Sequence, residues 1–167
     1  FTLFNSSDVF LLLKAKESGL SDTAVIGIYI FYNLVYALFA YPLGILADKI
    51  GLKKMLILGI GIFSLVYFGM GFKHNIPIFV GLFSLYGIYA AATEGISKAW
   101  ISNISDKKDT ATAIGTYSAF QSICTMLASS IASLIWYQFG ANITFFLTGF
   151  ASILVLLYFV LMTQEKK

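Results

Sequence analysis

Six long apolar runs, separated by short polar segments, constrain this chain more than any other feature of its sequence. A stretch of ~20 apolar residues is what an α-helix needs to cross a bilayer. Only 11% of the residues are charged, against roughly a quarter in a soluble domain, so a water-facing surface cannot be built. The sequence therefore predicts an all-α membrane protein, a single bundle over residues 1–167 with transmembrane helices at about 1–18, 24–47, 55–72, 77–100, 110–139 and 143–162.

The lysines between the runs predict which side of the membrane each loop occupies. All eleven basic residues are lysines. If the lysines after the second run are cytoplasmic, alternation of the helices leaves only Lys14, Lys16 and Lys73 outside. Cytoplasmic loops carry an excess of Lys and Arg. We therefore expect both termini to be cytoplasmic, and the basic balance indicates membrane orientation rather than a nucleic-acid partner.

Polar residues within the apolar runs are unevenly distributed. The third and sixth runs contain no charged or amide side chain, whereas each of the other four contains at least one. Polar groups that face lipid are costly, so we expect the third and sixth helices to face lipid and the others to enclose an interior. Twice along the chain, two runs that contain charged or amide side chains are followed by one run that contains none. This order predicts two three-helix inverted repeats.

Asp8 lies near the middle of the first run, about 15 Å along a helix from the predicted stop at Gly19. A carboxylate at that depth is costly unless it is paired. Two interpretations stand: the group takes up and releases a proton, or it only ties helices together through hydrogen bonds. Asn5 precedes Asp8 by three residues, on the same helical face, and is its candidate partner.

Further candidate cavity residues come from the second, fourth and fifth runs. Tyr29, Asn33 and Tyr36 form one stripe at i, i+4 and i+7, which either lines a cavity or packs with satisfied hydroxyl groups. The fourth run presents a face of Tyr86, Tyr89 and Thr93. The fifth run adds Gln121, beside a stripe of small polar residues that predicts a close helix contact and comprises Ser118, Ser122, Thr125, Ser129 and Ser133.

Glu94 and Lys98 lie one helical turn apart near the predicted cytoplasmic end of the fourth helix. They form either an ordinary i, i+4 ion pair or a gate at the inner mouth of a passage.

Sequence patterns of enzymes and metal sites are lacking. The chain has no H-E-x-x-H, no G-x-S-x-G and no visible pair of catalytic carboxylates. A single histidine, His74, and a single cysteine, Cys124, do not make a metal site. We expect a protein that is not an enzyme and that carries no metal or cofactor.

Residues 44–54, which join the second and third runs, read G-I-L-A-D-K-I-G-L-K-K. The glycine allows a neighbouring helix to approach closely, and the acid suits the positive end of a helix dipole. The segment resembles the signature loop of the major facilitator superfamily, G-x-x-x-D-[RK]-x-G-[RK]-[RK]. Leu52 stands where the family has a basic residue. The matching positions are Gly44, Asp48, Lys49, Gly51, Lys53 and Lys54.

The resemblance covers most of the chain. Residues 5–8, 41–44, 93–95 and 98–99 are similar to the C-terminal half of bacterial facilitators. This implies helices seven to twelve of a secondary transporter of the bacterial cytoplasmic membrane, with a small-molecule substrate and a missing N-terminal six-helix half as partners. It also implies alternating access, in which two halves rock about a central site and the signature loop stabilises one closed state.

Two functions from different classes remain open at this point. A transporter half, with proton coupling through Asp8 as a hypothesis, uses the ionisable group at mid-membrane. A non-transporting membrane scaffold or receptor-like module would keep the bundle without needing that group. Neither the substrate nor the direction of transport can be read from the residues.

Overall fold

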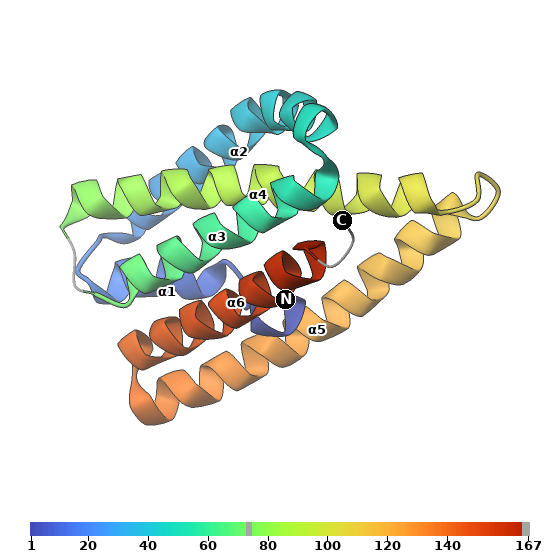
Figure 1. Cartoon of the computed structure of the whole chain (residues 1–167). Coiled ribbons are helices and arrows are strands. Elements are labelled where there is room, and N and C mark those ends of the chain that lie inside the picture. The colour runs from blue at the N-terminus through green and yellow to red at the C-terminus, as the bar shows by residue number, and fades with distance from the viewer. Residues whose placement is uncertain (73–74, 165–167) are drawn as a thin grey trace.

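The chain folds into a bundle of long helices (Figure 1). A computed structural model describes residues 1–72 and 75–164; Lys73, His74 and the last three residues lie outside this description. Every regular element in the described ranges is a helix, which confirms the all-α class. The elements are η1 (Thr2–Phe4), α1 (Val9–Glu17), α2 (Asp22–Ile50), α3 (Leu52–Met70), α4 (Ile76–Ile104), α5 (Thr110–Phe139) and α6 (Ala141–Gln164).

Within the described ranges, five helices, α2 to α6, are long and apolar enough to cross a membrane. The prediction of a continuous helix over 1–18 is wrong. α1 has nine residues, which reach only about 14 Å at 1.5 Å per residue, and the chain before it is a short 3-10 turn followed by irregular backbone. The side chains of Asn5, Ser6 and Asp8 bond to other helices instead. The Ser7 N–H also donates to another helix, so it is taken from a helical hydrogen bond.

The helix ends follow the local signals in the sequence. Gly19 ends α1 with φ of 100°, and its N–H donates to the Lys16 carbonyl at 2.9 Å, as in the glycine caps that close many helices. The Ser21 hydroxyl accepts a hydrogen bond from the Ala24 N–H at 3.3 Å, so α2 begins at Asp22.

α4 is the best-buried long helix, and it packs against α2 on one side and α3 on the other. Gly87 makes the contact with α2 possible, because a Cβ at this position would lie 2.7 Å from the Tyr32 carbonyl oxygen. α3 in turn packs against α6. The core between these helices contains the fully buried aromatic side chains of Phe63, Tyr67, Phe79, Phe83 and Phe145.

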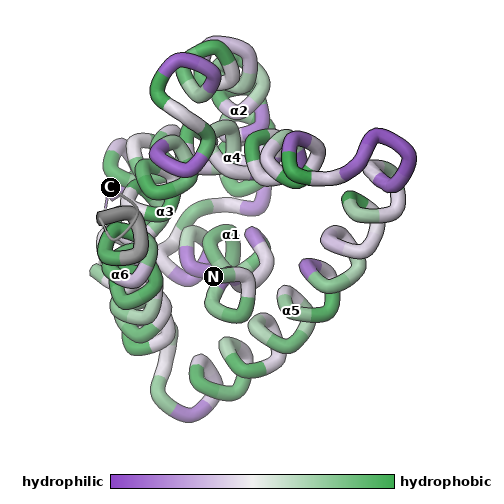
Figure 2. Tube along the Cα trace, turned by 45° about the vertical axis from the view of Figure 1, so that its right-hand side comes forward, coloured by the Kyte–Doolittle hydropathy of each residue, from purple (hydrophilic) through white to green (hydrophobic). Residues whose placement is uncertain are grey.

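The third helix does not have the peripheral position that its lack of polar residues predicts. It is second to α4 in burial, because its apolar side chains pack against α4 and α6 and do not face lipid alone. The short first segment is the interior element instead. Figure 2 shows α1 in the middle of the bundle, with α3, α4, α5 and α6 around it.

Candidate functional site

The irregular backbone ahead of α1 is held in place by tyrosine hydroxyl groups. The Tyr32 hydroxyl of α2 donates to Asp8 Oδ2 at 2.5 Å. The Tyr86 hydroxyl of α4 donates to Asp8 Oδ1 at 2.6 Å. Both oxygens of this carboxylate therefore accept a hydrogen bond from a different helix, and Asp8 faces the interior of the bundle.

Neighbouring residues of the same segment are tied to α4 again and to two further helices, α5 and α3. The Asn5 amide donates to the Tyr89 hydroxyl of α4 at 2.9 Å. The Ser7 N–H donates to the Ser129 hydroxyl of α5 at 3.1 Å. The Ser6 and Tyr67 hydroxyls approach to 3.4 Å, which adds α3. The irregular residues 5–8, the break in the first segment, are thus held by polar contacts from α2, α3, α4 and α5.

The predicted pairing of Asn5 with Asp8 is wrong. It assumed one continuous helical face, whereas residues 5–7 lie outside any helix and the two side chains bond to different tyrosines. Asn5 Oδ1 is buried and has no hydrogen-bond partner among the described residues. This oxygen is a spare acceptor beside the break.

A cavity of about 330 Å³ lies against this segment. It occupies the half of the bundle that contains the C-terminal part of α4 and the N-terminal part of α5, and apolar and aromatic side chains predominate in its wall. Three predicted cavity residues, Asn5, Tyr89 and Gln121, line it together with Glu94. Asp8 is not among the residues that line it. The other lining residues are Phe1, Thr2, Leu56, Ile60, Thr93, Ser97, Trp100, Ile101, Tyr117 and Phe159.

The predicted stripe on α2 does not reach this cavity. Tyr29 is exposed. The Asn33 amide donates to the Tyr29 carbonyl of its own helix at 2.8 Å. Tyr36 contacts the Glu94 side chain and lines a separate groove between α2 and α4. The stripe is one residue out of register with Tyr32, the α2 residue that does point inward.

Glu94 and Lys98 do not form the expected ion pair. No contact of 4.0 Å or less joins their charged groups, although both residues are described; the ion pairs of the described chain join Lys14 to Glu17 and Lys16 to Asp22. Glu94 lines the cavity, and Lys98 does not. A gate made by these two residues stays a prediction.

The signature segment forms a tight turn rather than the expected charged loop over 48–54. Gly51 has φ of 96°, and its N–H donates to the Ala47 carbonyl at 2.8 Å. This glycine conformation lets α3 begin at the next residue. Asp48 and Lys49 therefore belong to the last turn of α2, and Lys53 and Lys54 to the first turn of α3.

Gly44 does not make the close helix contact that was expected of it, because nothing lies within 4 Å of a Cβ built there. It lines the groove of about 290 Å³ between α2 and α4, together with Tyr36 and Asp48. Within the described chain the close approach of α2 and α4 occurs at Gly87 instead.

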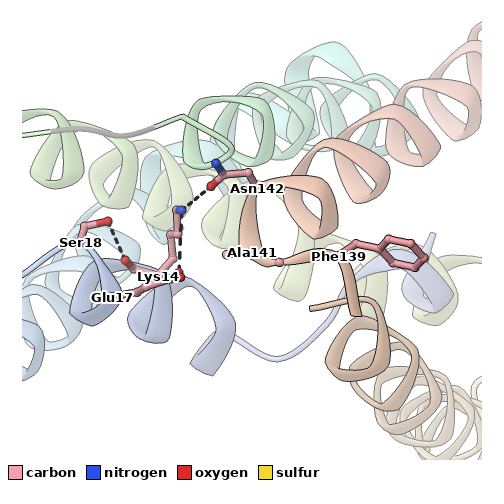
Figure 3. A pocket seen from close by; sticks show the side chains of 7 residues that line it. Lys14, Glu17, Ser18, Phe139, Ala141 and Asn142 are labelled. Atoms are coloured by element: carbon pink, nitrogen blue, oxygen red, sulfur yellow. Dashed lines mark hydrogen bonds and ion pairs between the residues drawn. The ribbon is translucent and has the colours of Figure 1, made fainter. Parts of the chain in front are cut away.

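A second cavity, of about 510 Å³, lies at the opposite end of the bundle, between the end of α1 and the turn from α5 to α6 (Figure 3). Lys14, which the lysine pattern assigns to the outer side of the membrane, is buried there. Its ammonium group donates to Asn142 Oδ1 at 2.5 Å and lies 3.9 Å from Glu17. The contact with Asn142 ties α1 to α6. None of the predicted site residues lines this cavity, so the smaller cavity is the better candidate site.

Tyr32 and Tyr86 are the site residues that sequence reasoning underrated. Tyr86 shares a helical face with Tyr89, so the recurrence of tyrosine on that face was a usable signal. Tyr32 is adjacent to the stripe that was favoured, and no pattern distinguishes the two. Among residues 1–72 and 75–164, no group of three or more His, Cys, Asp or Glu side chains is placed to hold a metal ion.

Comparison with known proteins agrees with the fold. A sequence model described as the Major Facilitator Superfamily matches residues 1–167. An uncharacterized MFS-type transporter of Methanocaldococcus jannaschii is 36% identical over 142 residues, which are 81% of this chain and 36% of that protein. The multidrug resistance protein Stp of Mycobacterium tuberculosis is 28% identical over 116 residues, 69% of this chain and 22% of that protein.

The chain thus spans about a third or less of the length of these two relatives. The match of the family model nevertheless covers all of its residues. The apolar helices α2 to α6 and the glycine–aspartate turn between α2 and α3 agree with that match. The chain belongs to the major facilitator superfamily of membrane transporters.

Proposed function

We propose that this chain is the C-terminal half of a secondary transporter that moves a small organic solute by alternating access. The observation that carries the proposal is the broken first segment, whose irregular backbone lies beside a cavity. Irregular backbone at membrane depth is tolerated where it is buried in protein or lines a water-filled cavity. Discontinuous helices of this kind form the substrate and ion sites of many transporters.

The chemistry of the cavity supports a solute site. Small-molecule sites are mostly apolar, with a few polar groups that fix orientation. Here Tyr89 and Gln121 present a hydroxyl and an amide from two helices, and Asn5 adds an amide from the break itself. The solute then meets groups from three separate segments, whose relative positions change as the helices move.

The rest of the transporter follows from the membrane arrangement. We place the lysine-rich α2–α3 and α4–α5 turns at the cytoplasmic side, in accordance with the positive-inside rule, in a bacterial type of cytoplasmic membrane. An N-terminal half completes the cavity, and each half consists of two three-helix inverted repeats. The groove at Gly44 and Asp48 then becomes a contact between the halves when the inner mouth closes.

Asp8 is the proposed proton-coupling group. Its carboxylate accepts one hydrogen bond from Tyr32 and one from Tyr86. A protonated carboxyl group gains a donor and loses part of its acceptor capacity, so protonation weakens the contact at the oxygen that takes up the proton. Because the contacts attach the first segment to α2 and α4, a proton at Asp8 changes how firmly that segment is held.

The test is transport by the intact protein in liposomes. We expect a panel of small organic solutes to include one whose addition moves protons across the membrane, as measured by an internal pH dye. Asp8→Asn should abolish the proton movement while solute exchange between equal internal and external pools continues. Asp106→Asn, at an exposed position between α4 and α5, is the matched control and should behave as the natural protein.

Two results would contradict the proposal at different levels. Absence of solute flux under any gradient would count against a transporter and favour a scaffold or receptor-like module. Unchanged proton movement in Asp8→Asn would leave transport standing and reduce Asp8 to a residue that ties helices together.

A further inference from the structure

The charge of the candidate cavity is one-sided. Among its lining residues the only ionisable side chain of acidic or basic type is Glu94, and no lysine, arginine or histidine belongs to the wall. Trp100 and Ile101 continue this wall on the same helix. The site therefore offers one carboxylate in otherwise uncharged surroundings.

Neighbouring charges do not neutralise this carboxylate. Asp8 does not line the cavity, but it is the second acidic residue that acts electrostatically on Glu94. Lys98, on the next turn of α4, is the basic residue that also acts on Glu94, but it lies outside the cavity wall and makes no ion pair with Glu94 within 4.0 Å. The carboxyl groups of Asp8 and Glu94 outnumber the ammonium group of Lys98, which does not line the cavity. This balance favours a positive charge in the cavity.

Aromatic rings provide the second half of the recognition. Tyr89, Trp100 and Tyr117 approach the cavity from α4 and α5, and Phe1 and Phe159 complete an aromatic wall. The face of an aromatic ring attracts a cation placed within about 6 Å of its centre. The same rings pack against an apolar body. Among the described lining residues no lysine, arginine or histidine offers an anion a partner.

From this combination we propose that the transported solute is an organic cation with an aromatic or bulky apolar body, and that Glu94 is its counter-charge. This inference rests on the proposed transport function and specifies the chemistry of its substrate. Tyr36, which contacts Glu94 from α2, positions the carboxylate. The cavity of about 330 Å³ is at the small end of the range for ligand sites, and it accommodates the charged part of such a solute.

Two probes of nearly identical shape test the charge preference directly. Tetraphenylphosphonium and tetraphenylborate carry opposite charges on the same four-ring body. Binding of each to the intact, detergent-solubilised protein is measured by equilibrium dialysis. We expect tetraphenylphosphonium to bind at least about tenfold more tightly, and Glu94→Gln to remove most of that preference. Glu94→Asp keeps the charge and should retain it, and Asp106→Asn is the control for a remote acid.

The outcomes separate this inference from the transport proposal. Equal binding of the two probes, tighter binding of the borate, or full preference in Glu94→Gln would overturn the cation assignment. If Glu94→Gln does not fold, the comparison of the two probes on the natural protein and on Glu94→Asp still decides. Cation binding that depends on Glu94 without any flux in liposomes would uphold the cation site and reject transport. Flux of solutes that are not cations, without binding of tetraphenylphosphonium, would uphold transport and reject the cation site.

Discussion

α4 and α5 are nearly the same length, 29 and 30 residues, and both are apolar enough to cross a membrane, yet they sit differently in the bundle. Half of the most apolar stretch of α4 is buried (50%), against 11% for α5. α4 is enclosed by α2 and α3, whereas α5 contacts mainly η1 and α6. Length and apolarity therefore allow a helix to cross the membrane, whereas the helices that pack against it determine how far it is buried.

The difference lies in the residues along each helix. α4 carries Gly87, which admits the backbone of α2, and Tyr86 and Tyr89, which hold the broken segment. α5 leaves a row of large apolar side chains open along much of its length, and its hydrogen bond to the irregular residues 5–8 comes from Ser129. The open row comprises Phe120, Ile123, Leu127, Ile131 and Leu134. The packed helix fixes the site, and the open one is available to lipid or to the second half.

Deletion of a large ring should show the largest contrast between the two helices. Phe83 on α4 is buried, and Phe120 on α5 is 65% exposed. Phe83→Ala should lower the free energy of unfolding by about 2–3 kcal/mol, because it leaves a void. This is less than the about 3–5 kcal/mol of a water-soluble core, since a micelle is as apolar as the protein interior. Phe120→Ala should cost less than about 0.5 kcal/mol.

Chemical unfolding of residues 1–167 in detergent measures both changes. An equal loss for the two variants would show that α5 is packed as tightly as α4. Repeating the pair in the intact protein sharpens the comparison, because a loss for Phe120→Ala that appears only there identifies this face of α5 as covered by the other half.

A matched pair of glycines should give effects of opposite sign. Gly87→Ala places a methyl group 2.7 Å from a backbone oxygen of α2, so the helices must move apart, at a cost of about 1–3 kcal/mol. Gly115 on α5 has nothing within 4 Å of a Cβ. Gly115→Ala should raise stability by up to about 1 kcal/mol, because alanine favours the helix. Thermal unfolding in detergent reports both, and a stable Gly87→Ala variant would refute the tight crossing.

The smallest expected effect concerns the polar contact of α5 with the break. Ser129→Ala removes the acceptor of the Ser7 N–H and should cost about 0.6 kcal/mol, the average for polar contacts between membrane helices. Ser130→Ala is the control, since its hydroxyl donates to the Met126 carbonyl of its own helix. Amide hydrogen exchange should become faster at Ser7 in the first variant only. Equal protection in both would mean that α5 does not hold the break.

Much of the site was predictable from residue type. Asp8, Asn5, Tyr89 and Gln121 were candidates because polar side chains inside an apolar run must face other protein groups or water, and the structure brings three of them to one cavity wall. The stripe on α2 was misjudged because Tyr32 directly precedes Asn33 of the stripe, and the sequence does not show which of the two neighbouring faces meets another helix. Gly44 and Gly87 pose the same difficulty. Either glycine allows a close helix contact, but the sequence does not show which of them meets a neighbouring helix.

By itself, the sequence determined the membrane class, helices α2 to α6, the cap at Gly19 and the turn around Gly51, because each depends on a few consecutive residues. Only the tertiary structure decided that the first run is broken, since the groups that bond to Ser7 and Asp8 lie on three other helices, as Tyr32, Tyr86 and Ser129. Helical periodicity is a local property. A hydrogen bond to a group 24 or 122 residues away does not alter that periodicity, so it cannot be predicted from it.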